Sequence, residues 1–220
     1  MIILAGGGGA DQSKKVDEKL KETVGMGGSI LYIPTALRGS DLYTECYDWF
    51  TNIFSDNNFN IDMWKQLQDK DSSDIPRYDA VYIGGGNTFM LSSELQKSGI
   101  AKELKTFHEH GVLYGGSAGA IICGNLLDAS RADKDGYEEQ THGINLLSDW
   151  SVWPHYTAKE EQKVQKFVNK HDTKVIATPE ETGIEVEGTQ GTVIGTKPAT
   201  MFTPKRQLRE IQPKETLQFD

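Results

Sequence analysis

Short apolar segments alternate along the chain with longer segments of helical periodicity. Apolar runs predict strands at residues 2–4, 30–33, 80–83 and 112–114. Amphipathic spacing predicts helices at residues 15–24, 41–54, 89–96 and 101–110. With a further strand at 60–67 and a helix after residue 117, the first 125 residues follow the order β-α-β-α-β-β-α-α-β-α. This order favours a mostly parallel sheet with helices on both faces.

The later part of the chain has a different pattern. Residues 129–140 are polar and predict loops or short strands, and strands are expected at 150–153 and 174–177, on either side of a helix at 160–170. The segment GIEVEGTQGTVIG, from Gly183, predicts hairpins with a turn near Thr189. The sequence shows no clear linker, so a single α/β domain over residues 1–220 is expected.

Composition and charge narrow the class of protein. Charged residues make up 25% and hydrophobic residues 37% of the chain, as in ordinary globular proteins, and the formal net charge is −9. This charge disfavours nucleic acid or an anionic membrane as a partner. No apolar run is long enough for a bilayer, and the first strand lacks the features of a signal peptide. Two distant cysteines, Cys46 and Cys123, argue against a disulfide scaffold and a zinc site, so a cytoplasmic location is expected.

The stretch YGGSAGA places Ser117 among small residues between a predicted strand and a predicted helix. A nucleophile elbow needs this pattern, because a sharp turn that exposes a serine tolerates only small neighbours. Such a turn also directs the N–H of Ala118 to the position of a developing oxyanion. The alternative is an ordinary turn in which Ser117 caps the helix.

Two further glycine clusters follow predicted strands. IGGGNTF begins at Ile83, on the strand expected beside that of Ser117, and could supply a second oxyanion donor; a phosphate-binding or packing turn is the alternative. LAGGGGAD has Asp11 where a dinucleotide-binding motif needs its third glycine. Nucleotide binding is therefore disfavoured, and no cofactor or metal is expected.

A serine nucleophile requires a base, and His155 is the candidate at a strand end, directly after the apolar segment SVWP. The alternative is a structural histidine packed among aromatic residues. The other histidines lie at helix ends or in a polar loop: His108, His110, His142 and His171. The third member of a triad is a carboxylate that orients the imidazole, and the residues alone do not choose it. The carboxylates between Ser117 and His155 are Asp128, Asp133, Asp135, Glu138 and Glu139.

IGGGNTF, GGSAGA and WPHY, in this order, resemble the dipeptidase E and cyanophycinase family of serine peptidases, from the first strand to the segment PEETGIEV. The resemblance implies a class I glutamine amidotransferase-like fold, a three-layer α/β/α sandwich with a mainly parallel sheet. It also implies hydrolysis of small peptides by Ser117 and His155 with Asp133, or Asp135, as the acid. The implied oxyanion donors are the N–H of Ala118 and that of Gly85 or Gly86. A homodimer is implied only at the level of the family.

The substrate pocket departs from the family pattern. Dipeptidase E has an arginine for an N-terminal aspartate at the position that aligns with Glu160, next to Lys159. Because a glutamate repels an aspartyl side chain and a lysine is not a bidentate fork, the sequence leaves the first residue open between aspartate and a basic or neutral residue. Asn87 and Tyr156 complete the residues expected to shape this pocket.

Two rival functions remain on the same fold. A glutamine amidotransferase-like hydrolase would need a cysteine nucleophile and a late H-x-E motif, whereas the elbow carries Ser117 and TPEETG has no histidine. A non-catalytic binding protein that kept the elbow is the second rival. Labelling by a covalent serine probe separates a binding protein from an enzyme.

Overall fold

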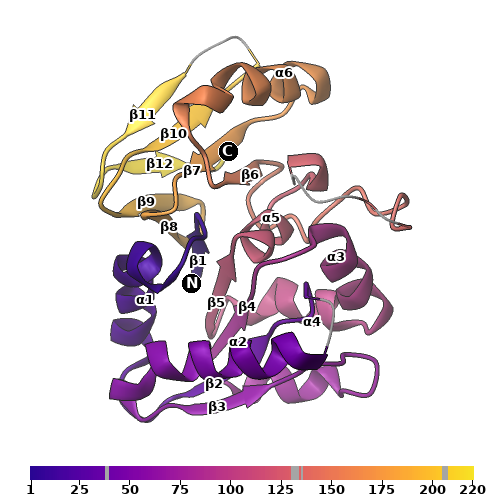
Figure 1. Cartoon of the computed structure of the whole chain (residues 1–220). Coiled ribbons are helices and arrows are strands. Elements are labelled where there is room, and N and C mark those ends of the chain that lie inside the picture. The colour runs from indigo at the N-terminus through magenta and orange to yellow at the C-terminus, as the bar shows by residue number, and fades with distance from the viewer. Residues whose placement is uncertain (38–39, 130–133, 135, 205–207) are drawn as a thin grey trace.

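The computed structural model describes residues 1–37, 40–129, 134, 136–204 and 208–220 (Figure 1). Its larger sheet has the strand order β12-β9-β8-β1-β5-β4-β2-β3. The strands β1, β5, β4, β2 and β3 are mutually parallel, and β8, β9 and β12 extend the sheet in antiparallel fashion. Their bounds are β1 Ile2–Ala5, β2 Ser29–Ile33, β3 Asn60–Met63, β4 Ala80–Ile83, β5 Val112–Gly116, β8 Thr182–Glu187, β9 Gln190–Gly195 and β12 Thr216–Gln218.

Helices cover both faces of the parallel strands. The α-helices are α1 Ala10–Val24, α2 Ser40–Ile53, α3 Thr88–Lys97, α4 Ile100–Phe107, α5 Ala118–Cys123 and α6 Glu161–His171. Alternate strand residues such as Tyr32 and Tyr114 pack against α1 and α2, while their neighbours, such as Ile33 and Leu113, pack against α3, α4 and α5. The expected mainly parallel sheet flanked by helices is therefore confirmed.

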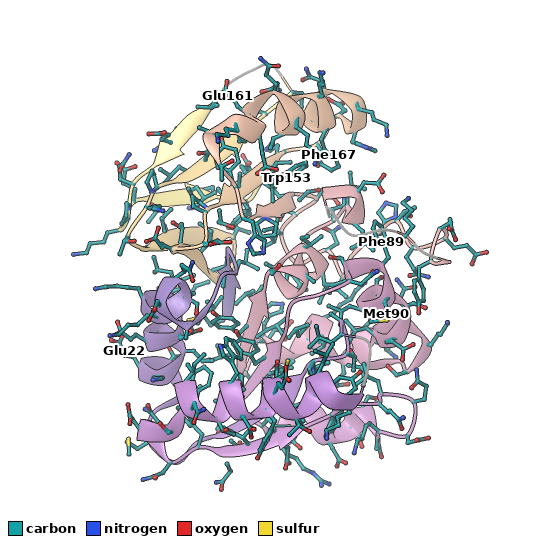
Figure 2. All side chains as sticks on the ribbon, in the orientation of Figure 1. Glu22, Phe89, Met90, Trp153, Glu161 and Phe167 are labelled. Carbon is teal, nitrogen blue, oxygen red and sulfur yellow. The ribbon has the colours of Figure 1, made fainter. Side chains whose placement is uncertain are left out.

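A second sheet, which the sequence pattern did not separate from the first, has the order β11-β10-β7-β6. Its strands are β6 Ser151–Pro154, β7 Val175–Thr178, β10 Ala199–Phe202 and β11 Arg209–Ile211. Helix α6 covers it, with Trp153 packed edge-on against Phe167 at 5.7 Å between ring centroids (Figure 2). Figure 1 shows this sheet and α6 gathered at the top of the view, above the parallel strands.

Both sheets contribute to one continuous hydrophobic core. Ile2 and Leu4 of the larger sheet belong to the same buried cluster as Val152, Ile176 and Ala199 of the smaller one. Short 3-10 helices complete the described elements: η1 Ser55–Asn57, η2 Ser72–Arg77, η3 Leu127–Ala129 and η4 Ala158–Glu160. Among the described helices, none has the length and apolar character needed to cross a bilayer.

Candidate active site

Ser117 occupies the sharp turn between β5 and α5. Its φ of 51° and ψ of −105° lie in a region that non-glycine residues rarely adopt, which is typical of functional sites. A β-carbon added at Gly119 would lie 2.4 Å from the carbonyl oxygen of Ile83, so α5 can approach β4 only with glycine there. The Ser117 hydroxyl makes no cap of α5, which argues against the helix-cap alternative.

His155 follows the last residue of β6 and contacts the serine directly. Its Nε2 lies 2.8 Å from Oγ of Ser117, and its backbone N–H donates to the carbonyl of Gly6 at 2.9 Å. A β-carbon added at Gly7 would lie 2.3 Å from Cε1 of the ring, and Gly7 has a φ of +90°. The glycine turn after β1 therefore leaves room for the imidazole, a role that its sequence pattern did not indicate.

Glu180 completes a hydrogen-bonded path from the serine. Its Oε1 lies 2.9 Å from Nδ1 of His155, and Nε2 of Gln12 donates to its Oε2 at 3.4 Å. β6 and β7 are parallel neighbours with Pro154 paired to Thr178, so residues just beyond both strand ends meet. A neutral imidazole protonated at Nδ1 fits both contacts, because Nδ1–H then donates to the carboxylate and Nε2 accepts from the serine.

Glu180 is not among the acids that the sequence predicts for the triad. Asp133 and Asp135 lie outside the described residues. Asp128 forms an ion pair with Lys134 at 3.1 Å, and Glu138 accepts from the N–H of Gly136 at 3.3 Å. Glu180 follows His155 in the chain, outside the segment between Ser117 and His155 in which the acid was expected. A sequence signal for it exists, since Glu180 follows an apolar strand that ends at the same edge as the strand before His155.

The glycine turn after β4 faces the serine. A β-carbon added at Gly85 would lie 3.3 Å from Cβ of Ser117, whereas one added at Gly86 would lie 2.3 Å from the carbonyl oxygen of Ala36. No backbone hydrogen bond within the described residues uses the N–H of Gly85 or of Ala118. Gly85 thus lies nearer to the reacting oxygen than Gly86.

The residues expected to shape the substrate pocket lie outside the cavity beside Ser117. Asn87 caps α3 through Oδ1, which accepts from the N–H groups of Phe89 and Met90. Tyr156 is buried against Phe202, and Lys159 is exposed. The carboxylate of Glu160 accepts from the backbone N–H of Thr157 at 3.3 Å. None of the four expected residues is among those that line the cavity beside Ser117, and their role in substrate binding stays a prediction.

That cavity has a volume of about 250 Å³ and opens beside the serine and the histidine. It extends toward α1 and α2, on the side of the sheet that carries Tyr32, Tyr82 and Tyr114. Among the described residues, no group of three or more histidine, cysteine, aspartate or glutamate side chains could hold a metal ion.

Comparisons with known proteins show the family and the fold of this chain. The model of peptidase family S51 matches residues 1–194. A probable alpha-aspartyl dipeptidase of Drosophila melanogaster is 23% identical over 87% of this chain and 82% of its own length. A peptidase E of Nostoc sp. is 26% identical over 86% of this chain and 82% of its own. The crystal structure of a peptidase from an acI-B1 Actinobacterium superposes with a TM-score of 0.77 at 17% identity, covering 99% of this chain and 96% of that one.

Proposed function

Because the chain belongs to peptidase family S51 and is a serine-type peptidase, we propose that it hydrolyses small peptides through Ser117, His155 and Glu180. One observation carries the proposal: hydrogen-bond distances of 2.8 and 2.9 Å join the serine to the histidine and the histidine to the glutamate. The side chains of His155 and Glu180 are 31% and 42% exposed, so a substrate and water can reach them. The base contacts the nucleophile and the orienting acid contacts the base, which is the arrangement that acyl transfer requires.

In the first step, Ser117 Oγ attacks the peptide carbonyl while Nε2 of His155 takes its proton. Glu180 stabilises the imidazolium through Nδ1–H and fixes the orientation of the ring. The N–H groups of Gly85 and Ala118 stabilise the tetrahedral oxyanion, each donor contributing roughly 3–4 kcal/mol in comparable sites. His155 then protonates the leaving amine, and water activated by the same imidazole releases the acyl group from Ser117.

The aspartyl preference named for the Drosophila relative is not proposed for this chain. Glu160 stands where the family arginine is expected, and its carboxylate already accepts a backbone hydrogen bond at the start of η4. An N-terminal aspartate would meet no arginine fork at that position. The preference for the first residue must therefore come from another part of the site.

The proposal is tested by the hydrolysis of a panel of dipeptides and amino-acyl amides, Asp-X included, together with labelling by a fluorophosphonate probe. Wild type should cleave part of the panel and be labelled once, on Ser117. Ser117→Ala should lose both properties, whereas Ser55→Ala, at an exposed serine of η1, should keep them. If wild type shows neither cleavage nor labelling, the fold acts as a binding protein and the proposal fails.

A further inference from the structure

Three tyrosines line the cavity beside Ser117 and form its floor, on the face of the sheet toward α1 and α2. Its lining includes Tyr32, Tyr82 and Tyr114 from three parallel strands, with Ser13 of α1 and Trp49 of α2. A β-carbon added at Gly116 would lie 3.4 Å from the hydroxyl oxygen of Tyr82, which places this hydroxyl directly below the strand end that carries the nucleophile.

A buried carboxylate lies behind this floor. Asp17 of α1 is 2% exposed; Tyr114 donates to its Oδ1 at 2.7 Å and Ser13 donates to its Oδ2 at 2.6 Å. Lys21 attracts Asp17 from one turn further along α1, but it does not line the cavity. Among the described residues, those that line the cavity include neither lysine nor arginine, so the cavity faces a negative centre with no cation of its own.

The hydroxyl of Tyr114 is oriented by Asp17. Tyr114 has one hydroxyl proton and donates it to Oδ1 of Asp17, so its oxygen can act toward other groups only as an acceptor. An acceptor backed by a carboxylate favours a charged donor.

The size of the cavity suits a single amino-acid side chain. The α-carbons of Tyr114 and Ser117 are about 10 Å apart along the strand, and the ring of Tyr114 reaches back toward the strand end, with its Cε1 3.7 Å from a β-carbon added at Gly116. Ser13 and Asp17 are one helical turn apart, about 6 Å, with Ser13 nearer the mouth because α1 begins at this edge of the sheet. The volume of about 250 Å³ falls just below the usual range of ligand pockets, which suits one amino-acid side chain.

We propose that this cavity is the subsite for the side chain of the residue whose carbonyl Ser117 attacks, and that it selects a cationic side chain, as in lysyl or arginyl peptides. The inference rests on the proposed peptidase function, because it takes the peptide carbonyl to lie at Ser117. An ammonium or guanidinium group reaching the floor would find the Tyr114 oxygen as an acceptor and the charge of Asp17 behind it, whereas an aspartyl side chain would be repelled.

The first test measures binding to the Ser117→Ala variant by calorimetry, with Lys-Leu, norleucyl-Leu and Asp-Leu as ligands. Norleucine matches the lysine side chain without its charge, so the comparison isolates the ammonium group. Lys-Leu should bind roughly 10- to 100-fold more tightly than norleucyl-Leu, the range expected for a charge-assisted hydrogen bond. Equal binding of the two, or tighter binding of Asp-Leu, overturns the inference.

The second test locates the preference in the cavity floor. Asp17→Asn should lower kcat/KM for Lys-Leu by at least about 10-fold more than it lowers kcat/KM for norleucyl-Leu. Tyr82→Phe removes one hydroxyl group from the cavity lining without touching Asp17, and it replaces the first variant if that one folds poorly. It should lower the ratio of kcat/KM for Lys-Leu to kcat/KM for norleucyl-Leu. If the ratio of the two kcat/KM values is unchanged in both variants, the cavity floor does not select the substrate.

Failure of the inference is distinguishable from failure of the peptidase proposal. Fluorophosphonate labelling of wild-type Ser117 depends on the triad and not on a cationic side chain. Labelling without a preference for Lys-Leu would leave the peptidase function standing and refute the subsite. Without labelling, the binding comparison on Ser117→Ala still decides whether the cavity takes a cation.

Discussion

At the scale of single residues, the proposed nucleophile and the proposed base share an unusual backbone conformation. Ser117 has a φ of 51° and His155 a φ of 52°, and each comes directly after the last residue of a strand. Such conformations cost about 1–3 kcal/mol each and persist where the surrounding structure enforces them. Hydrogen bonds from the N–H of Ser117 to Ala5 and from that of His155 to Gly6 hold both turns against the end of β1.

The Glu180→Gln substitution should separate the catalytic role of this residue from any structural one. A glutamine keeps the size of the side chain but cannot stabilise the imidazolium, so kcat should fall roughly 100- to 10,000-fold. The melting temperature should change little, because the side chain of Glu180 is 42% exposed. Glu181→Gln is the matched control, since Glu181 pairs with Lys197 at the surface and should retain full activity. Similar kcat values for the two variants would contradict the role assigned to Glu180.

Asp17 should make the free energy of unfolding depend on pH. Burial raises the pKa of its carboxyl above the ordinary 3.8, although hydrogen bonds from Ser13 and Tyr114 oppose the shift. The folded protein then holds this proton to higher pH than the unfolded chain does. The associated stability is fully present below the unfolded pKa and is lost as pH rises through the folded pKa.

Asparagine does not titrate, so Asp17→Asn should lack this loss of stability. Urea unfolding at pH 4 and pH 7 checks the expectation: the free energy of unfolding of the variant, minus that of wild type, should increase with pH. A difference that stays constant, or that falls between the two pH values, would contradict it.

Residues that lie in short, recognisable sequence motifs could be predicted from the sequence. Ser117 and His155 stand in short, distinctive segments at strand ends, and the structure places them 2.8 Å apart. Glu180 has no such motif, because its position depends on the pairing of β6 with β7 across an intervening helix. Asp17 was likewise missed, since one acidic residue in a charged helix looks solvent-exposed until the packing of Tyr114 against α1 is known.

At the scale of elements, the elbow depends on how closely α5 approaches β4 and β5. Gly119→Ala would place a methyl group 2.4 Å from the carbonyl oxygen of Ile83, so α5 and Ser117 must shift. The variant should lose about 1–3 kcal/mol of unfolding free energy, measured in urea, together with most of its peptidase activity.

Gly9→Ala is the matched control for this substitution. Gly9 has an extended backbone with a φ of −82°, and an added methyl group would meet only the side-chain oxygen of Gln12, at 3.2 Å. Stability and activity should therefore stay close to wild type. Equal losses in the two variants would mean that the approach of α5 is not what positions the serine.

Some helices and strands begin or end at other residues than the hydrophobic pattern predicts, because local hydrogen bonds set their ends. Helix α1 begins at Ala10, five residues before the predicted helix, because Gln12 Oε1 accepts from the N–H of Gly9 and supports an earlier start. The strand expected at 60–67 ends at Met63. The hairpin expected near Thr189 forms as β8 and β9. The sequence could not predict that β6 and β7 belong to a second sheet, because an apolar run does not specify which other strand it pairs with.

At the scale of the whole molecule, the proposed catalytic groups come from two sheets. Ser117 follows β5 of the larger sheet, whereas His155 and Glu180 follow β6 and β7 of the smaller one. The sheets share one hydrophobic core, so they should unfold together. Urea transitions followed by activity, far-UV circular dichroism and tryptophan fluorescence should coincide, since Trp64 reports on the core of the larger sheet and Trp153 on the smaller. Loss of activity well before the other signals would show that the smaller sheet opens alone.

The pairing of β1 also has a consequence for biosynthesis. β1 lies between β5 and β8, so one edge of this early strand stays uncovered until residues 182–187 have left the ribosome. Glu180 emerges shortly before these residues. A partly synthesised chain that already contains Ser117 and His155 therefore lacks the third member of the proposed triad. The order of the strands delays assembly of this site until residues 182–187 have been translated.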